Sequence, residues 1–236
     1  MWPSPQEFNE AIQNPHLCFE DEDLKSSGVC LNPLGLPRSI TGAFASVYQM
    51  KNKNQSFAGR CFLEERTILI ERYKKIESFF KSEIDFEALL DFRFLERGIN
   101  VRGRWYPILK MEWCDGVPLD QYLAKHIKNT SRINQLKEGF YQLAAFLNKK
   151  NIAHGDLQHG NILVSRDRLY LVDYDGMFIP DFSGSESVEL GHRNFQHPKR
   201  SNCDFSISLD NFSAWIIYTS LQCLSIDPSL WERLEC

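Results

Sequence analysis

The sequence predicts an α+β protein with two lobes, a small lobe rich in β-strands and a mainly helical one. Segments that alternate apolar and polar residues, as strands do, gather in the first half of the chain. Helical patterns dominate the second half. Of the 236 residues, 43% are hydrophobic, which is enough apolar mass for the core of a chain of this length.

The first half contains four recognisable elements. Residues 4–7, Ser-Pro-Gln-Glu, predict a helix start, because Ser caps, Pro fits the first turn and Glu completes a capping box. Residues 39–63 alternate around a polar turn at residues 51–55, which predicts a hairpin of two strands. A helix is expected over residues 65–83, and a buried strand over residues 105–113.

The second half begins with an amphipathic helix, expected over residues 132–151. Two short apolar runs, residues 161–164 and 169–172, flank a polar turn and predict a second small hairpin. A loop with Ser, Gly and Pro follows, and then a largely apolar helix over residues 209–224. The aromatic side chains of Phe44, Trp113 and Trp215 are expected to lie in the core or to line a site.

Composition argues against several classes of protein. The chain has 27 basic and 31 acidic residues, a formal charge of −4, so no nucleic-acid partner is expected. The basic cluster at residues 197–200 is expected to be a solvated loop face. Seven scattered cysteines without a C-x-x-C pair disfavour a disulfide framework and a zinc ribbon. Neither a signal peptide nor a membrane span is visible, so the expected location is the cytoplasm.

The stretch IAHGDLQHGNILV, residues 152–164, carries the strongest chemical signal. A metal site built on His154 and His159 is disfavoured, because their spacing matches no zinc pattern. A plain polar turn would leave the order of the polar residues unexplained. The third interpretation is a loop for phosphoryl transfer: Asp156 and Asn161 lie at its ends, and the following hairpin delivers Asp173. Carboxylate and amide oxygens suit both a general base and Mg²⁺ ligands.

This stretch resembles the catalytic loop H-R-D-L-x-x-x-N of the protein-kinase superfamily, and Asp173-Tyr174-Asp175 is similar to its D-F-G motif. The resemblance covers roughly residues 39–224 and is closest in pattern to compact bacterial kinase-like proteins. The other matching segments are the glycine-rich loop (Gly42 to Val47), the A-x-K of the third strand (Ala58-Gly59-Arg60), the hinge (Met111 to Cys114), the segment ending in A-P-E (Gly191 to Pro198) and the D-x-W-S helix start (Asp210 to Ser213).

The resemblance implies a kinase that uses ATP and Mg²⁺. Asp156 would be the catalytic base, supported by Asn161, and Asn161 and Asp173 would hold Mg²⁺. Asp210 would brace the backbone of the catalytic loop, and His154 would support that loop by packing. The residues expected to bind ATP are Gly42, Val47, Ala58, Arg60, Glu77, Glu112, Cys114 and Leu163.

The resemblance also implies a domain plan. Residues 1–37 are expected to form an N-terminal extension with a short helix, and residues 38–236 the kinase-like domain. Its N-lobe would span about residues 38–112 and its C-lobe about residues 116–236. The C-lobe is expected to be truncated after the helix at 209–224.

Some positions depart from the family pattern in the region expected to bind ATP. Only Gly42 remains of three loop glycines, and Arg60 replaces the phosphate-binding lysine with a longer, planar cation. Glu77 is the preferred partner for Arg60, since it lies at the edge of the apolar helix face. Glu71 is expected to form a solvated pair with Lys74 instead.

Other departures concern the substrate and regulation. Gly155 replaces an arginine that reads a phosphorylated activation loop in the family, and Lys199 replaces the glutamate of A-P-E. The chain is therefore expected to be active without loop phosphorylation, with control by a protein partner or by expression. Small-molecule phosphotransferases of the superfamily also have glycine at the position of Gly155 and lack a lysine at the position of Gln158. Two acceptor classes therefore stay open: protein Ser/Thr, which is preferred, and small-molecule hydroxyls. A pseudokinase that binds nucleotide is the third alternative, favoured by Arg60 and the eroded glycine loop.

Overall fold

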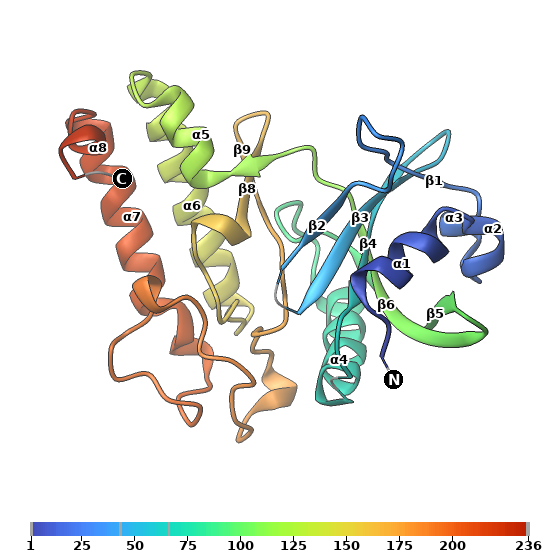
Figure 1. Cartoon of the computed structure of the whole chain (residues 1–236). Helices are drawn as coiled ribbons and strands as arrows, with labels where there is room; N and C mark the ends of the chain where they lie inside the picture. Colours follow the sequence, from blue (N-terminus) through green and yellow to red (C-terminus); the bar gives the residue numbers. More distant parts are fainter. Residues whose placement is uncertain (1, 43, 66, 235–236) are drawn as a thin grey trace. The chain divides into compact units, whose positions relative to one another are not determined.

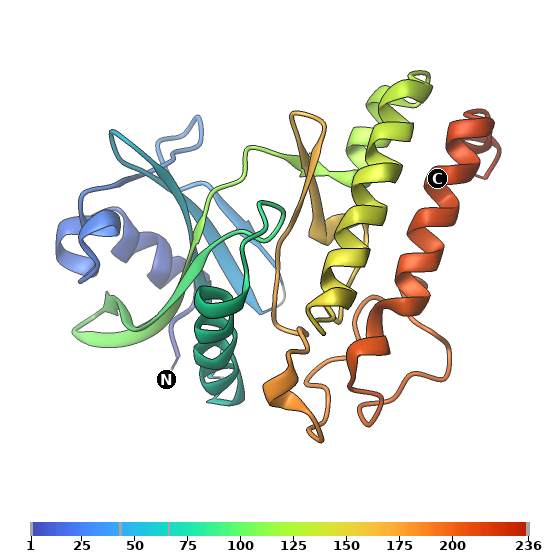
Figure 2. The same ribbon diagram turned by 180° about the vertical axis from the view of Figure 1, so that it is seen from behind.

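The computed structural model describes residues 2–42, 44–65 and 67–234. The chain forms two compact units (Figures 1 and 2). Unit 1 comprises Met1–Lys81 and Asp91–Trp113, and unit 2 comprises Ser82–Leu90 and Cys114–Cys236. Unit 1 is built on a sheet and unit 2 is mainly helical, so the predicted α+β class is confirmed.

Unit 1 contains one antiparallel sheet with the strand order β1-β3-β4-β6-β5, and β2 pairs with β3. The expected hairpin is confirmed as β3 and β4, whose partners include Val47 opposite Arg60 and Gln49 opposite Ala58. Its elements are α1 (Pro5–Ile12), α2 (Pro15–Cys18), α3 (Glu22–Lys25), β1 (Gly28–Val29), β2 (Ser39–Thr41), β3 (Ala45–Lys51), β4 (Ser56–Phe62), α4 (Thr67–Glu83, whose last two residues belong to unit 2), β5 (Phe92–Val101) and β6 (Arg104–Glu112).

The N-terminal helices cover one face of this sheet. The predicted capping box is present at Ser4 and Glu7, and it starts α1 so that Phe8 and Ile12 are fully buried. These side chains belong to a core cluster with Tyr48, Met50, Cys61, Ile99 and Ile108 of the strands, among others. The segment before residue 38, which the sequence left without a role, therefore contributes to the core of unit 1.

A buried ion pair ties the same segment to the sheet. Lys110 of β6 is 5% exposed, and its Nζ donates to Asp21 Oδ1 at 2.7 Å and to Asp23 Oδ2 at 2.5 Å. The ammonium also lies 4.6 Å from the centroid of the Phe57 ring. A buried lysine needs such partners, because an unpaired charge in the core is costly. The hydrophobic run around Lys110 gave no sign of this pairing.

Helix α4 carries an aromatic contact to the sheet. The Tyr73 ring lies edge-on to Phe92 at 5.7 Å and stacks with Phe94 at 6.0 Å between ring centroids. Phe92 and Phe94 belong to β5, a strand that the sequence analysis did not identify. Its charged residues interrupt the apolar alternation, and a register shift between Leu95 and Ile99 breaks its period further.

Unit 2 pairs two long helices with a small sheet. Helices α6 and α7 lie side by side in both views (Figures 1 and 2), and the predicted hairpin is confirmed as β8 and β9. The elements of unit 2 are β7 (Val117–Pro118), α5 (Leu119–His126), α6 (Thr130–Lys149), η1 (His159–Asn161), β8 (Ile162–Ser165), β9 (Arg168–Leu171), η2 (Pro180–Phe182), η3 (Arg193–Phe195), η4 (Ile207–Asp210), α7 (Asn211–Ile226) and α8 (Leu230–Arg233).

Helix α7 is apolar on more than its buried face. It contains no Asp, Glu, Lys or Arg, and it buries Ile217, Leu221 and Leu224. Trp215 is nevertheless 69% exposed on this helix, and Phe44 of unit 1 is 50% exposed. Neither ring therefore lies in the core. Trp215 instead lines a cavity of about 380 Å³ together with Phe140 and Tyr141 of α6, which agrees with the second alternative, that this ring lines a site.

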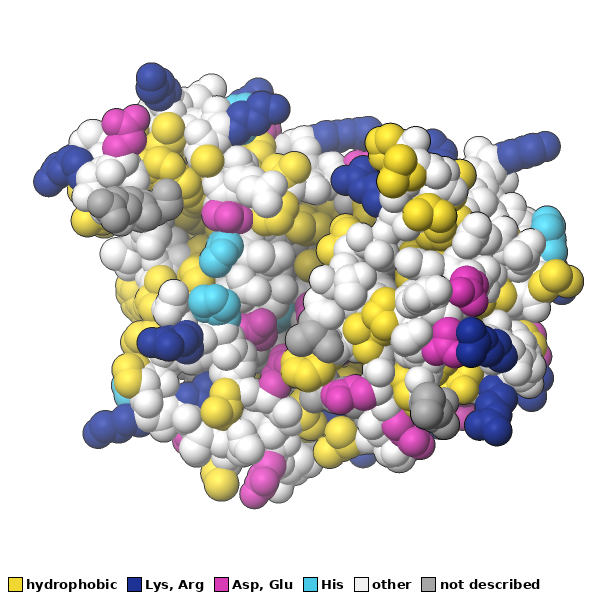
Figure 3. Space-filling model, viewed as in Figure 1, with side chains coloured by type: hydrophobic (Ala, Val, Ile, Leu, Met, Phe, Trp, Pro, Cys, Tyr) yellow, Lys and Arg dark blue, Asp and Glu magenta, His cyan; other side chains and the backbone are white. Residues whose placement is uncertain are grey.

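The surface is mixed in charge. On the face that Figure 3 shows, Lys and Arg side chains are scattered among Asp and Glu side chains. Among the described helices, none combines the length and the apolar composition needed to cross a membrane.

Candidate active site

The predicted site residues divide between the two units, with Asp156, Asn161 and Asp173 in unit 2 and Arg60 and Glu77 in unit 1. In unit 2, the backbone of the catalytic loop is fixed by Asp210. Its carboxylate accepts hydrogen bonds from the backbone N–H of His154 and, at 2.9 Å, from that of Gly155. The bracing role expected for Asp210 is confirmed by these two bonds.

Asp210 is a buried acid at the start of α7, with 8% exposure. Burial raises the pKa of its carboxyl, whereas the electrostatic interaction with His154 and the two backbone donors lower it. His154 is itself fully buried, and its Nε2 lies 3.0 Å from the carbonyl oxygen of Val172. The packed, hydrogen-bonded role expected for His154 is therefore confirmed.

Gly155 fills a position that no other residue type could occupy without strain. Its φ is +84°, in the left-handed region. A Cβ at this position would also collide with the carbonyl group of Gly176. Gly155 is thus not only the loss of the family's arginine, because the backbone at this position requires a residue without a Cβ.

The Asp156 carboxylate is held at both oxygens. Asn161 Nδ2 donates to Asp156 Oδ2 at 2.8 Å and to the Asp156 carbonyl oxygen at 2.9 Å. The backbone N–H of His192 donates to Asp156 Oδ1 at 2.5 Å. The carboxylate is half-buried, and these donors fix its orientation. A group in this state can accept a proton from a hydroxyl placed beside it.

Asn161 and Asp173 come from neighbouring stretches of backbone. The N–H of Val172 donates to the carbonyl oxygen of Asn161 at 3.0 Å, and Asp173 is the next residue. Asp173 follows β9 with φ +67°, a conformation that Asp tolerates better than most residues, and it is half-buried. The Asn161 amide nitrogen faces Asp156, which leaves its oxygen as the atom able to bind a metal. These donors fit Mg²⁺, which prefers oxygen ligands.

A histidine-based metal site is a separate question. Within residues 2–42, 44–65 and 67–234, no group of three or more His, Cys, Asp or Glu side chains is arranged to hold a metal ion. His159 lies near His192 and Phe195 instead, at ring-centroid distances of 6.0 and 5.3 Å. These rings form an aromatic surface close to Asp156, since the N–H of His192 is bonded to it.

Residues 189–200, which we call the 189–200 segment, lie against the catalytic loop. Gly191 has φ +70°, and a Cβ there would lie 2.8 Å from Asp156 Oδ1. Arg200 Nη1 donates to the carbonyl oxygen of Gly155 at 2.7 Å. The expectation that residues 197–200 form a solvated loop face is therefore wrong for Arg200, which is half-buried, whereas His197, Pro198 and Lys199 are exposed.

In unit 1, the residues expected to bind ATP share one face of the sheet. Val47, Ala58 and Arg60 point to the side opposite the N-terminal helices, because strand residues alternate between faces. Arg60 Nη1 donates to the Tyr73 hydroxyl at 2.9 Å, and its guanidinium carbon lies 5.5 Å from the centroid of Phe62.

Glu77 has partners within unit 1. Its Oε2 accepts the backbone N–H of Phe94 at 2.9 Å, and its Oε1 accepts Lys81 Nζ at 2.5 Å. Glu71 pairs with Lys74 at 3.3 Å on the exposed surface, as expected.

The remaining predicted ATP residues are at the ends of strands. Gly42 is exposed and its N–H donates to the Ala45 carbonyl oxygen at 2.9 Å, whereas Ala43 of the same loop lies outside the described residues. The N–H groups of Glu112 and Trp113 donate to the carbonyl oxygens of Asp91 and Ser56. A contact of Glu112 or Trp113 with adenine would therefore use their carbonyl oxygens.

The other end of the predicted hinge region belongs to unit 2. Cys114 and Leu163 are both half-buried. Leu163 lies in β8, between Pro118 of β7 and Tyr170 of β9.

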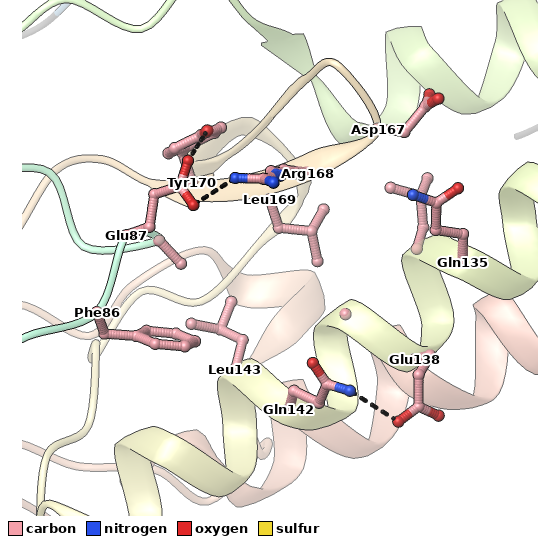
Figure 4. Close-up of a pocket in the computed structure, with 13 residues that line it drawn as sticks. Phe86, Glu87, Gln135, Glu138, Gln142, Leu143, Asp167, Arg168, Leu169 and Tyr170 are labelled. Carbon is pink, nitrogen blue, oxygen red and sulfur yellow. Dashed lines mark hydrogen bonds and ion pairs between the residues drawn. The ribbon is translucent and has the colours of Figure 1, made fainter.

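Unit 2 also contains a cavity of about 430 Å³ between α6, β9 and residues 86–88 (Figure 4). Leu143, Leu169 and Phe86 form apolar walls, and Figure 4 shows Glu87 pointing to Arg168 and Tyr170. None of the predicted site residues lines it. Because no residue of the catalytic loop lines this cavity, it is not the site that the loop serves.

Comparison with known proteins gives matches to parts of the chain. Residues 106–184, which include Asp156, Asn161 and Asp173, match the model of the ABC1 atypical kinase-like domain. Over 66 residues the chain is 39% identical to the probable bifunctional tRNA threonylcarbamoyladenosine biosynthesis protein of Methanosarcina barkeri (strain Fusaro / DSM 804). That stretch covers 28% of this chain and 10% of the relative, so the chain matches only a small part of that protein.

Proposed function

Because the chain belongs to the protein-kinase-like superfamily, we propose that it transfers the γ-phosphoryl group of ATP to a hydroxyl acceptor, a Ser or Thr of a protein. The observation that carries the proposal is the Asp156 carboxylate, held by Asn161 on one oxygen and by the His192 N–H on the other. An oriented carboxylate on a braced loop suits the removal of a hydroxyl proton.

In this proposal each residue of unit 2 has a separate task. Asp156 accepts the proton of the acceptor hydroxyl while the hydroxyl oxygen forms a bond to the γ-phosphorus of ATP. The bond between that phosphorus and the bridging oxygen of the β-phosphate breaks, and ADP leaves. The Asn161 amide oxygen and the Asp173 carboxylate hold Mg²⁺, which neutralises charge on the phosphates when it is bound. Asp210 keeps the loop backbone in place and touches no reacting atom. In unit 1, Arg60 is proposed as the cation for the phosphates.

A second candidate acceptor is a small molecule. The glycine at position 155 and the absence of a lysine at position 158 favour it, because small-molecule phosphotransferases of the superfamily share both features. The two acceptor classes share the same chemistry at Asp156, so the acceptor has to be identified by experiment.

The test is transfer of labelled phosphate from ATP by the full chain, with Mg²⁺, to a protein mixture and to a set of small hydroxyl compounds. Asp156→Asn is expected to reduce turnover by about 100-fold or more and to leave nucleotide affinity unchanged. Asp173→Asn is expected to weaken Mg²⁺-dependent ATP binding by about ten-fold or more. Asp181→Asn is the matched control, because Asp181 is an exposed aspartate of the same region.

Three results would contradict the proposal in different ways. Equal loss of ATP affinity in the Asp156 and Asp173 variants would remove the division between base and metal ligand. Transfer of labelled phosphate to small hydroxyl compounds and to no protein would show that the acceptor is a small molecule and not a protein Ser or Thr. Mg²⁺-dependent ATP binding by the wild type with no transfer to any acceptor would indicate a nucleotide-binding pseudokinase.

A further inference from the structure

We propose that Arg200 is a positioning residue for Asp156, and that its guanidinium clamps the 189–200 segment onto the catalytic loop without a phosphate group. The proposal rests on the proposed function in one respect, that Asp156 is the base. The clamp itself is a matter of contacts inside unit 2 and can be tested apart from any activity.

The first step is the pair of bonds that Arg200 makes. Nη1 donates to the carbonyl oxygen of Gly155 at 2.7 Å, and Nη2 to that of Glu189 at 3.3 Å. Gly155 immediately precedes Asp156, and Glu189 begins the 189–200 segment. One planar group with two donor nitrogens therefore joins the loop to the segment, which a single ammonium could not do with the same geometry.

The charge of the Arg200 guanidinium supports the clamp as well. Burial lowers the pKa of the Arg200 guanidinium, and the carboxylates of Asp210, Glu189 and Asp156 oppose that shift. Arginine stays protonated under these conditions, because its intrinsic pKa is far above neutrality. A half-buried cation is thus placed among several acids, where it offsets the negative charge around the loop.

The third step links the clamp to the base. Between Glu189 and Arg200 the chain passes Gly191 and His192, and the His192 N–H bonds Asp156 Oδ1 at 2.5 Å. Gly191 allows this approach, since any Cβ there would crowd that oxygen. Anchoring the segment at Gly155 holds His192 in place. Loss of the anchor would free one oxygen of Asp156 from its donor.

Other contacts of the segment are weaker or do not cross to the loop. Gln196 Nε2 reaches the Gly155 carbonyl oxygen at 3.5 Å, the limit of a hydrogen bond, and its Oε1 is buried without a partner in the described structure. Ser187 Oγ donates to the Glu189 carbonyl oxygen at 2.6 Å, close to the segment's own start. Of the two side chains of the segment that reach the Gly155 carbonyl oxygen, Arg200 therefore makes the shorter hydrogen bond.

The experiment compares Arg200→Ala and Arg200→Lys with the wild type, and uses Arg193→Ala as the matched control. Arg193 is an exposed arginine of the same segment. Two quantities are measured on each full chain: hydrogen–deuterium exchange of the peptide that contains His192, and phosphoryl transfer with kcat and KM for ATP determined separately.

For Arg200→Ala we expect exchange at His192 to rise by about ten-fold or more, and kcat to fall by about ten-fold while KM for ATP changes less than about two-fold. Arg200→Lys should lie between, since it keeps the charge but not the two-pronged geometry. Millimolar guanidinium ion should restore part of the kcat of Arg200→Ala. Arg193→Ala should match the wild type in both measurements.

Unchanged exchange and unchanged kcat in Arg200→Ala would overturn the proposal. So would a lower unfolding free energy with normal kcat, since Arg200 would then be structural only. If Arg200→Ala does not fold, Arg200→Lys carries the same comparison. If the wild type transfers no phosphate but exchange at His192 still rises in the variants, the clamp stands and the proposed function fails.

Discussion

The catalytic loop of unit 2 and the strand that carries Arg60 in unit 1 were predicted from the same family pattern, but their contacts differ in kind. In the loop, the predicted residues bind one another: Asn161 holds Asp156, and Asp210 holds the backbone before it. On the strand, Arg60 donates to the hydroxyl of Tyr73, a residue that belongs to none of the matching motifs. The relative positions of motif residues within one short loop are set by the loop itself. The relative positions of residues on separate elements depend on long-range packing.

The energetics of the two regions differ as well. The loop uses buried donors and acceptors, and each one left unsatisfied would cost about 1–3 kcal/mol. In unit 1, Glu77 forms an ion pair on helix α4 with Lys81, whose side chain is 58% exposed, and such pairs are worth about 0–1 kcal/mol. Loss of a buried hydrogen bond in the loop should therefore cost more than loss of this ion pair.

The largest expected effect is at Gly155. Gly155→Ala combines a left-handed backbone with a collision against Gly176, and we expect it to lower the free energy of unfolding by about 3–5 kcal/mol. The measurement is urea denaturation of the full chain. Gly184→Ala is the control, because Gly184 has nearly the same φ, +81°, but no atom within 4 Å of an added Cβ.

Gly184→Ala should cost only the strain of the backbone, about 1–2 kcal/mol. The difference between the two variants then measures the close approach of Gly176 alone. Equal losses of unfolding free energy in the two variants would show that the catalytic loop relaxes around the added Cβ. The contrast between the catalytic loop and the strand that carries Arg60 would then weaken.

The same glycine shows where sequence reasoning stops. His154, Asp156, Asn161 and Asp210 could be identified because the stretches that contain them resemble the catalytic loop and a helix start of the protein-kinase superfamily. The steric need for Gly155 depends on Gly176, and the donor to its carbonyl oxygen is Arg200, which is 45 residues away. Neither distance leaves a periodic signal in the sequence.

The fold was predictable to a similar degree. The hairpins and long helices follow from alternation and helical spacing, and their bounds differ from the expected ones by a few residues. Strand β5 was not predicted, because its charged residues interrupt the alternation of apolar and polar residues. The packing of Phe8 and Ile12 on the sheet could not be read from the chain, since it depends on which face of a sheet remains open.

A smaller effect is expected at Arg60, on the other side of the comparison. If Arg60 binds phosphate, Arg60→Met should raise KM for ATP by about ten-fold, and Arg60→Lys should stay within about three-fold because the charge remains. Tyr73→Phe is the control: it removes the hydroxyl to which Arg60 donates but keeps the cation. An Arg60→Met chain with unchanged KM and lower stability would make Arg60 a structural strand residue.

The smallest effect on phosphoryl transfer is expected for the three serines of the loop after Asp173, Ser183, Ser185 and Ser187. Ser183 and Ser185 are exposed, whereas Ser187 is 5% exposed and donates to the Glu189 carbonyl oxygen. Gly155 offers no guanidinium to a phosphate on Ser183 or Ser185, and the Arg200 guanidinium already binds the carbonyl oxygens of Gly155 and Glu189. Replacing all three serines with Ala should therefore leave phosphoryl transfer within about two-fold of the wild type.

Stability separates the three serines further. Ser187→Ala alone should lower the free energy of unfolding by about 1 kcal/mol, because it removes one buried hydrogen bond, and the two exposed serines should have no measurable effect. A fall in transfer of about ten-fold in the triple variant, roughly 1.4 kcal/mol of barrier, with stability accounted for by Ser187, would show that phosphorylation of this loop matters. The 189–200 segment would then need a phosphate in addition to Arg200 to hold its place beside Asp156.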